Sequence, residues 1–147
     1  VVRDRAKVVT DIKKGNYLEG RLGLIIDGTG AKADKLLRQK AHLEGLGYDT
    51  YMVFVNTSLD VALERNTKRA RSVPESIVVK SWKDVQANIG AFNNAFKGTN
   101  MIIVDNNNVN DDIFAVASKR VRGLLRKKVQ NNRAKEWMAL ELAKKRR

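Results

Sequence analysis

Apolar residues recur at helical spacing along five stretches of the chain. A spacing of three or four residues places them on one face of an α-helix, which can then pack against a core. The most regular stripe runs from Val78 to Phe96, and we expect it to pack into the core. Together the stripes predict helices over residues 1–14, 33–46, 59–71, 74–96 and 111–143.

Three shorter apolar runs show no alternation with polar residues. Such runs are typical of strands that are buried on both faces, as in a parallel sheet. We expect strands over residues 21–27, 49–56 and 101–105. Because strands alternate with helices, the sequence predicts an α/β fold, a three-layer parallel sheet with helices on both faces. Residues 1–110 would form this domain, and residues 111–147 a long basic helical extension.

Several residues mark where the expected helices begin and end. Gly15 is expected to end the first helix, so that residues 16–20 form a connector. Ser58 carries the hydroxyl that a helix N-cap needs. Val73 precedes the chain's one proline and therefore avoids helical geometry. Pro74 itself fits the first position of the next helix.

The composition excludes several classes of protein. The chain contains no cysteine, so it has no disulfide and no thiolate metal site, which fits a reducing, cytoplasmic compartment. Its one histidine, His42, lacks the partners of a metal site or a Ser-His-Asp site, and we expect a surface or packing residue. No apolar run reaches the length of a membrane span, so no membrane partner is expected.

The net charge of +13 is distributed unevenly, since residues 111–147 contribute +8 of it. Such a surface concentrates polyanions, among which nucleic acid is the commonest candidate. A solvated terminal helix explains the same charges, as does a protein-binding segment in which residues 137–142 dock on a partner. The candidate nucleic-acid contacts are Arg126, Lys127, Lys128, Arg133 and Lys135.

Four cations, Arg65, Lys68, Arg69 and Arg71, lie close together after the second predicted strand. Guanidinium groups match phosphate oxygens in a bidentate way and stabilise the charge that spreads over a phosphoryl group during transfer. The cluster therefore suits a helix that closes over the phosphates of a nucleotide. A solvated basic helix face is the alternative.

Polar residues follow the first and third predicted strands. Asp27 would lie at the edge where α/β proteins bind ligands, and its carboxylate suits Mg²⁺, which prefers oxygen ligands. Gly28 and Gly30 would let the backbone approach a ligand closely. Asn106, after the third strand, could contact a nucleotide base. Ordinary turns explain both loops as well.

In this order the residues resemble the later part of a P-loop kinase of the polynucleotide kinase and zeta-toxin group, most of all the phage-type polynucleotide kinases. The Arg-Asn-x-Lys-Arg and Val-Pro elements are the more specific part of this resemblance. The motifs that carry it are Ile25-Ile26-Asp27-Gly28-Thr29, Gly47-Tyr48, Arg65-Asn66-Thr67-Lys68-Arg69 and Val73-Pro74.

The resemblance implies that Arg65 and Arg69 belong to a lid that holds the donor phosphates of ATP, with Lys68 and Arg71 beside them. It implies that Asp27 lies near Mg²⁺ or near the phosphate-bearing substrate. The family's phosphate loop, Gly-x-x-x-x-Gly-Lys-Ser/Thr, is missing from the sequence. An upstream segment or another chain would have to supply it and complete the sheet, or the fold has lost catalysis.

The leading hypothesis is therefore the carboxyl-terminal portion of an ATP- and Mg²⁺-dependent kinase. Its acceptor would be a polynucleotide 5′-hydroxyl or a small hydroxyl compound, and this portion alone is expected to be inactive. The resemblance also implies a phage-encoded protein in the cytoplasm of its host. The alternative is a catalytically inactive, kinase-like scaffold that binds nucleic acid or serves in assembly through its basic C-terminal helix.

Overall fold

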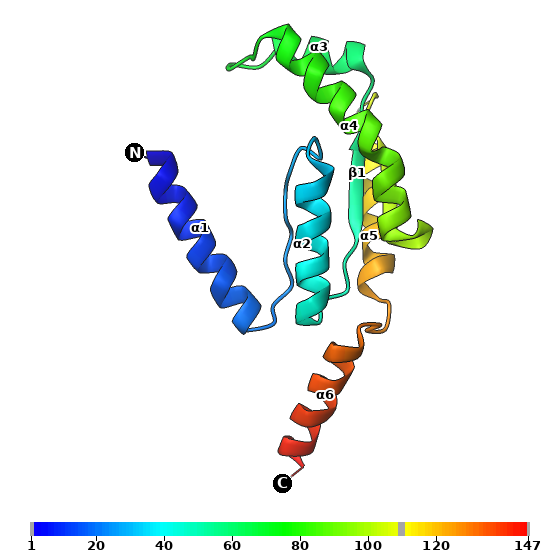
Figure 1. Cartoon of the computed structure of the whole chain (residues 1–147). Helices are drawn as coiled ribbons and strands as arrows, with labels where there is room; N and C mark the ends of the chain where they lie inside the picture. Colours follow the sequence, from blue (N-terminus) through cyan, green and yellow to red (C-terminus); the bar gives the residue numbers. More distant parts are fainter. Residues whose placement is uncertain (1, 109–110, 147) are drawn as a thin grey trace.

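The computed structural model describes residues 2–108 and 111–146, and most of them are helical. Val1, Val109, Asn110 and Arg147, which some predicted ranges include, lie outside the described residues. Figure 1 shows the arrangement of the elements. In chain order they are α1 (Val2–Glu19), α2 (Ala33–Leu46), β1 (Met52–Asn56), α3 (Leu59–Thr67), α4 (Glu75–Phe96), η1 (Gly98–Asn100), β2 (Met101–Asp105), α5 (Asp111–Leu125) and α6 (Asn132–Lys145).

The predicted three-layer parallel sheet is wrong, because the described chain has only two strands in one small sheet. The missing strand is the one expected over residues 21–27. Residues 22–29 have no regular secondary structure, Ile25 is fully exposed and Ile26 is half exposed. A strand needs a neighbour for its backbone N–H and C=O groups, and no strand of the described residues pairs with this segment.

The other two predicted strands are confirmed as β1 and β2. They pair in parallel, from Met52 opposite Met101 to Asn56 opposite Asp105. Parallel neighbours need a crossover connection, which α3 and α4 provide here. The carboxyl ends of both strands therefore lie at the same end of the molecule, where α3 begins (Figure 1).

The core lies between one face of the sheet and helices α2 and α4. Phe92 of α4 is fully buried, and its ring centroid lies 6.4 Å from that of Phe54 in β1. Phe96 and Met101 complete the buried cluster, and Leu36 of α2 packs against it. The expectation that the stripe of α4 packs into the core is therefore confirmed.

The opposite face of the sheet is covered unevenly. Helix α5 packs against β2 and buries Leu124. Val53 and Val55 of β1, which alternate with the buried Phe54, remain largely exposed. Strand β1 is thus covered on one face only, whereas an apolar run of this kind is typical of strands covered on both.

Helix α1 is longer than the sequence predicts. It continues through Gly15 to Glu19, so the predicted connector over residues 16–20 is wrong. A glycine inside a helix costs only about 1 kcal/mol relative to alanine, which a helix of this length can tolerate. Figure 1 shows α1 standing beside α2 without packing against it, and none of its described residues is buried.

The predicted ends of α3 and α4 are confirmed only in part. Ser58 is confirmed as the N-cap of α3, since its hydroxyl accepts a hydrogen bond from the Val61 N–H at 3.4 Å. Helix α3 ends before the predicted boundary, so residues 68–73 form a loop rather than a helix. Pro74 was predicted as the first helical residue of α4, but it occupies the N-cap, and the helix begins one position later at Glu75.

The long helix predicted over residues 111–143 is wrong, because the chain divides into α5 and α6. Between them, the Asp49 carboxylate accepts hydrogen bonds from the backbone N–H of Gln130 at 2.8 Å and of Asn131 at 2.9 Å. The Asn131 side chain then accepts the Arg133 N–H at 3.0 Å and caps α6. These contacts with a distant part of the chain favour a break that helical periodicity does not reveal.

The substitution Phe92→Ala tests whether this aromatic contact holds the core. It should lower the free energy of unfolding by about 3–5 kcal/mol, the usual cost of removing a buried phenylalanine. Urea denaturation followed by circular dichroism measures the change. The matched control is Phe114→Ala on α5, where the side chain is 67% exposed. Equal losses for the two variants would contradict the assignment of the core.

Candidate functional site

The polar loop that follows β2 is hydrogen-bonded to the carboxyl end of β1. The Asn106 N–H donates to the Asn56 carbonyl at 2.8 Å and so continues the pairing of the strands. The Asn107 side chain donates to Asp105 at 2.6 Å and accepts the Ser58 N–H at 2.7 Å. The loop after β2 is therefore bonded to the start of α3. A contact between Asn106 and a nucleotide base stays a prediction.

Arg65 is the cation that reaches this loop. Its Nη2 donates to the Asn107 carbonyl at 3.1 Å, and its side chain is partly buried. The other three predicted cations lie beyond the end of α3, on the exposed loop of residues 68–73. Lys68 forms an exposed ion pair with Glu64. The cluster is thus divided into one anchored guanidinium and three cations on a loop.

Helix α4 ties the loop before α2 to the same end of the molecule. Its Gln86 donates to the Asn56 side chain at 2.9 Å. One half-turn further, Asn88 donates to the carbonyl groups of Gly30 and Ala31 at 3.0 and 3.2 Å. Figure 1 shows this loop running along α2 and turning into it at the end where the strands finish. Asp27 lies in that loop and is exposed.

Two hollows of the described structure are lined by other residues than Asp27, Arg65 and Arg69. One hollow, of about 640 Å³, lies along α4 between Glu75 and Asp84. The other, of about 520 Å³, lies at the opposite end of the strands, where Lys127 and Lys128 contribute to its wall. The predicted anion site therefore coincides with neither of these hollows.

The metal prediction rests on Asp27 alone. Among residues 2–108 and 111–146, no three side chains of histidine, cysteine, aspartate or glutamate come together as a metal site. Mg²⁺ is commonly held by one or two carboxylates together with substrate phosphates. A role for Asp27 toward Mg²⁺ therefore stays tied to a bound nucleotide, and both remain predictions.

Two of the five candidate nucleic-acid residues form contacts with other residues of this chain. The Lys127 ammonium donates to Thr99 and Asn100 and lies 5.6 Å from the ring centroid of Tyr51. Arg133 donates to the Gly45 carbonyl. Both contacts fasten the junction between α5 and α6 to the body of the protein.

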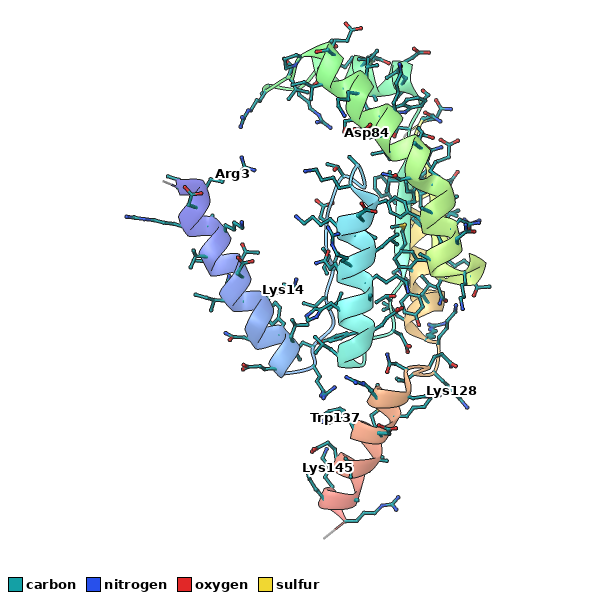
Figure 2. The ribbon with its side chains drawn as sticks, viewed as in Figure 1. Arg3, Lys14, Asp84, Lys128, Trp137 and Lys145 are labelled. Carbon is teal, nitrogen blue, oxygen red and sulfur yellow. The ribbon has the colours of Figure 1, made fainter. Side chains whose placement is uncertain are left out.

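The remaining three candidates, Arg126, Lys128 and Lys135, are exposed. Figure 2 shows Lys128 at the junction of α5 and α6, and the side chains of α6 extending outward as far as Lys145. Their contact with nucleic acid stays a prediction. Docking of residues 137–142 on a partner stays a prediction too. Trp137 of this segment already stacks with Arg21, whose guanidinium carbon lies 4.7 Å from the ring centroid.

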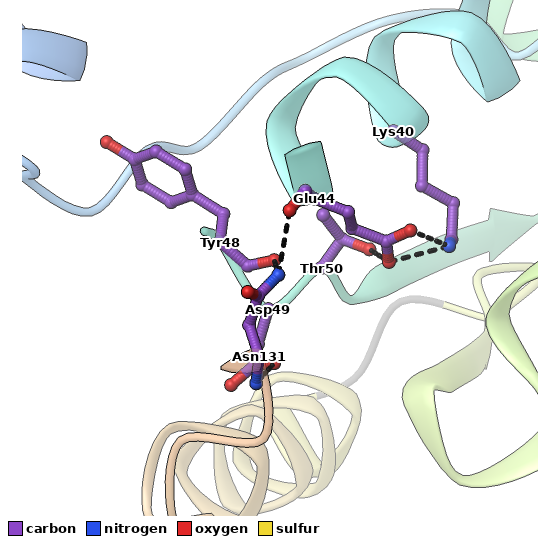
Figure 3. A network of polar contacts seen from close by, with 6 residues as sticks. All are labelled: Lys40, Glu44, Tyr48, Asp49, Thr50 and Asn131. Carbon is purple, nitrogen blue, oxygen red and sulfur yellow. Dashed lines mark hydrogen bonds and ion pairs between the residues drawn. The ribbon is translucent and has the colours of Figure 1, made fainter. Parts of the chain in front are cut away.

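A polar network holds α6 against the end of α2 (Figure 3). The Asn131 amide donates to the carbonyl groups of Glu44 and Tyr48 at 2.8 and 3.2 Å. The Glu44 carboxylate accepts hydrogen bonds from Lys40 at 2.6 Å and from Thr50 at 2.6 Å. Burial raises the pKa of the Glu44 carboxyl, but the bonds from Lys40 and Thr50 outweigh it, so that this pKa lies below its ordinary value.

Sequence reasoning missed most of the residues that build the polar end of the sheet. Asn56 and Asp105 are the polar last residues of otherwise apolar strands, as Asp27 follows an apolar run, so their position was a usable signal. Gln86 and Asn88 carried no such signal, because they sit on the polar side of a regular amphipathic helix. Their partners lie far away in the sequence, and only the folded chain reveals them.

Comparisons with models of protein families, with curated proteins and with solved structures found no match to this chain. The resemblance to P-loop kinases therefore remains a hypothesis. No helix of the described residues is long and apolar enough to cross a membrane, as the sequence predicts.

The lowered pKa of Glu44 gives a prediction about pH. A carboxyl group with a lower pKa in the folded state stabilises the fold above its unfolded pKa, roughly 4.3, and this contribution is lost as the pH falls through the folded value. Glu44→Gln should therefore lower the thermal midpoint at pH 7 and make it fall less steeply between about pH 6 and 3. Thermal scans across this range measure both effects.

The matched control is Glu141→Gln, which removes a partly buried carboxylate that pairs with the exposed Lys144 on α6. It should leave the pH profile close to that of the unmodified chain, because exposed ion pairs contribute little to stability. Parallel profiles for the unmodified chain and for Glu44→Gln would show that Glu44 does not titrate as inferred.

Proposed function

We propose that this chain is the donor-phosphate-holding portion of an ATP-dependent phosphotransferase. The observation that carries the proposal is the position of Arg65, a partly buried guanidinium at the carboxyl ends of two parallel strands. The acceptor would be a polynucleotide 5′-hydroxyl or a small hydroxyl compound. Mg²⁺ would accompany the nucleotide and neutralise charge on its phosphates.

The chemistry of Arg65 supports this role. A guanidinium has five N–H donors in a fixed plane, and the bond to the Asn107 carbonyl orients that plane while using one of them. The remaining donors suit phosphate oxygens, which accept bidentate hydrogen bonds. Partial burial strengthens such a contact, because the surroundings screen charge less than water does.

The loop that follows α3 adds further positive charge. Arg69 and Arg71 are exposed there, and no ion pair of the described residues engages them. A transferring phosphoryl group spreads its charge over several oxygens, so that cations from more than one segment can share it. The resemblance of the segment from Arg65 to Pro74 to the lid of polynucleotide kinases points the same way.

A phosphate loop would have to come from a segment outside this sequence or from another chain, which would complete the site at the exposed side of β1. The residues present fit phosphate oxygens, but they form no metal site of their own. The chain alone is therefore expected to bind phosphates weakly and to transfer none.

The substitution Arg65→Ala tests the proposal in the chain as it stands. It should weaken the binding of inorganic triphosphate about 10- to 100-fold, because a hydrogen bond to a charged group contributes roughly 1.5–3 kcal/mol. Isothermal titration in low-salt buffer measures the affinity. Arg65→Lys should retain part of it, since lysine keeps the charge but not the planar fork.

The control for Arg65→Ala is Arg38→Ala on α2, which removes an exposed charge away from the loop after β2. Equal affinities for these two variants would remove Arg65 from the phosphate site. The same result would remove the observation on which the proposed phosphotransferase function rests.

The alternative function is nucleic-acid binding by a catalytically inactive, kinase-like scaffold. The observation that favours it is the exposure of Arg126, Lys128 and Lys135 within a segment of net charge +8. Arg126 and Lys128 lie between α5 and α6, and Lys135 lies on α6. Long, exposed cationic side chains of this kind suit contacts with a phosphate backbone. The same surface could serve in assembly with a partner, but no described feature selects one.

Replacing Arg126, Lys128 and Lys135 together by alanine tests this alternative. If the three cations contact phosphates, affinity for single-stranded DNA should fall, and the slope of log affinity against log salt should decrease by up to about 2, at roughly 0.7 per contact. Fluorescence anisotropy over a salt series measures both. Lys127 is left in place because it fastens the junction.

A control with the same loss of charge is the triple alanine variant of Arg3, Lys7 and Lys13 on α1, all of which are exposed. It tests whether binding depends on the position of the charge or only on its amount. An unchanged salt slope in the variant that lacks Arg126, Lys128 and Lys135 would contradict binding through these three residues.

A further inference from the structure

Asn66 is the one buried polar residue in the part of the chain that the structure describes. It lies on α3 next to Arg65, and its side chain is bonded to the residue before Pro74, at the start of α4. Its Nδ2 donates to the Val73 carbonyl at 2.8 Å, and its Oδ1 accepts the Val73 N–H at 3.1 Å. One amide therefore binds both backbone groups of a single residue seven positions away.

This double contact closes the loop that carries the cations. Residues 68–72 lie between the two bonded positions, and Val73 leads directly into Pro74 and α4. Just before the start of α3, the Thr57 carbonyl accepts a hydrogen bond from the indole N–H of Trp82, in the first half of α4, at 2.8 Å. Both ends of α3 are thus bonded to the α4 side of the chain, which fixes the two positions between which the loop runs.

Val73 gives a physical reason for the contact. A residue before proline is restricted to extended geometry, and here it follows no strand that could satisfy its backbone groups. Although Val73 is exposed, its N–H and its C=O are both bound by the Asn66 amide, which supplies the partners that a neighbouring strand would otherwise provide.

The loop presents its charged residues outward. Lys68, Arg69 and Arg71 are all exposed, and Lys68 is paired with Glu64. Flexible cations lose conformational entropy when they bind, whereas a loop held at its base has lost part of that freedom beforehand. A closed loop can hold two guanidinium groups at a spacing that suits neighbouring phosphates of one chain.

From these contacts we infer that Asn66 is a positioning residue whose amide closes the loop of residues 68–72, so that Arg69 and Arg71 bind neighbouring phosphates of a polyphosphate together. The ligand class is the triphosphate of a nucleotide donor. The inference rests on the proposed function, because it assigns to this loop the phosphates that Arg65 also contacts. Asn66 itself touches no ligand.

The first measurement is hydrogen exchange of the Val73 amide by NMR. In the unmodified chain this N–H is bonded to Asn66 and should exchange slowly. Asn66→Ala should remove the protection of Val73 while leaving the amides of β1 and β2 protected. Unchanged exchange at Val73 would show that the amide does not close the loop.

The second measurement compares inorganic triphosphate with orthophosphate as ligands in calorimetric titrations. Asn66→Ala should weaken triphosphate about tenfold and orthophosphate much less, because only the longer anion needs both arginines at a fixed spacing. A residue with only a structural role would change the two affinities in the same proportion. That result would overturn the positioning role.

A second variant covers the case in which Asn66→Ala fails to fold. Inserting two glycines after Arg71 leaves Asn66 and Val73 unchanged but lengthens the loop between them. It should reduce the preference for triphosphate over orthophosphate while β1 and β2 keep their exchange protection. An unchanged preference in this variant would overturn the inference.

The two proposals fail in different ways. Triphosphate binding that depends on Arg65 but neither on Asn66 nor on loop length would overturn the positioning role and leave the proposed function standing. Absence of triphosphate binding by the unmodified chain would overturn both.

The variant Asn66→Gln keeps the amide but moves it by one methylene. If the geometry of the two hydrogen bonds matters, its preference for triphosphate over orthophosphate should be little higher than that of Asn66→Ala.

Discussion

The contact between Phe92 and Phe54 is the interaction on which the rest of this structure depends. It holds α4 against β1, and α2 packs against the same buried cluster. Polar side chains follow on the same helix: Gln86 reaches the end of β1, and Asn88 reaches the loop before α2. The packing of one aromatic face therefore also sets the position of the polar end of the sheet. A helix that lost this contact would release both loops together.

Local signals predicted several elements. The stripe of α4 and the Ser58 cap follow from spacing and from a single side chain, and the apolar runs of β1 and β2 marked two strands that do find each other as neighbours. The segment over residues 21–27 shows the limit of this reasoning. Its apolar run is typical of a buried strand, but a strand forms only where a neighbour satisfies its backbone. Whether such a neighbour exists is a property of the whole fold, which no local pattern contains.

The candidate site was predicted in its residue types more than in its arrangement. Arg65 was singled out for its charge, yet its anchor is the carbonyl of Asn107, far along the chain. Asn66 belonged to one of the motifs that carry the resemblance. Its two hydrogen bonds to Val73, however, depend on where α3 ends. The end of α3 in turn separates Arg65 from Arg69 and Arg71. The four cations that lie close together in the sequence are therefore divided in the structure. Arg65 is anchored on α3, and the other three lie on the exposed loop that follows.

The distribution of charge at the two ends of the strands can be understood in the same terms. At the carboxyl ends, Arg65 is partly buried and bound through one donor, so it retains donors for an anion. At the amino ends, Lys127 is occupied by Thr99, Asn100 and the ring of Tyr51. Both regions are basic in sequence, but a cation that has satisfied its donors within the fold contributes only its long-range field to a ligand. The donors that remain on Arg65 therefore favour the carboxyl ends of the strands as the place of the proposed anion site.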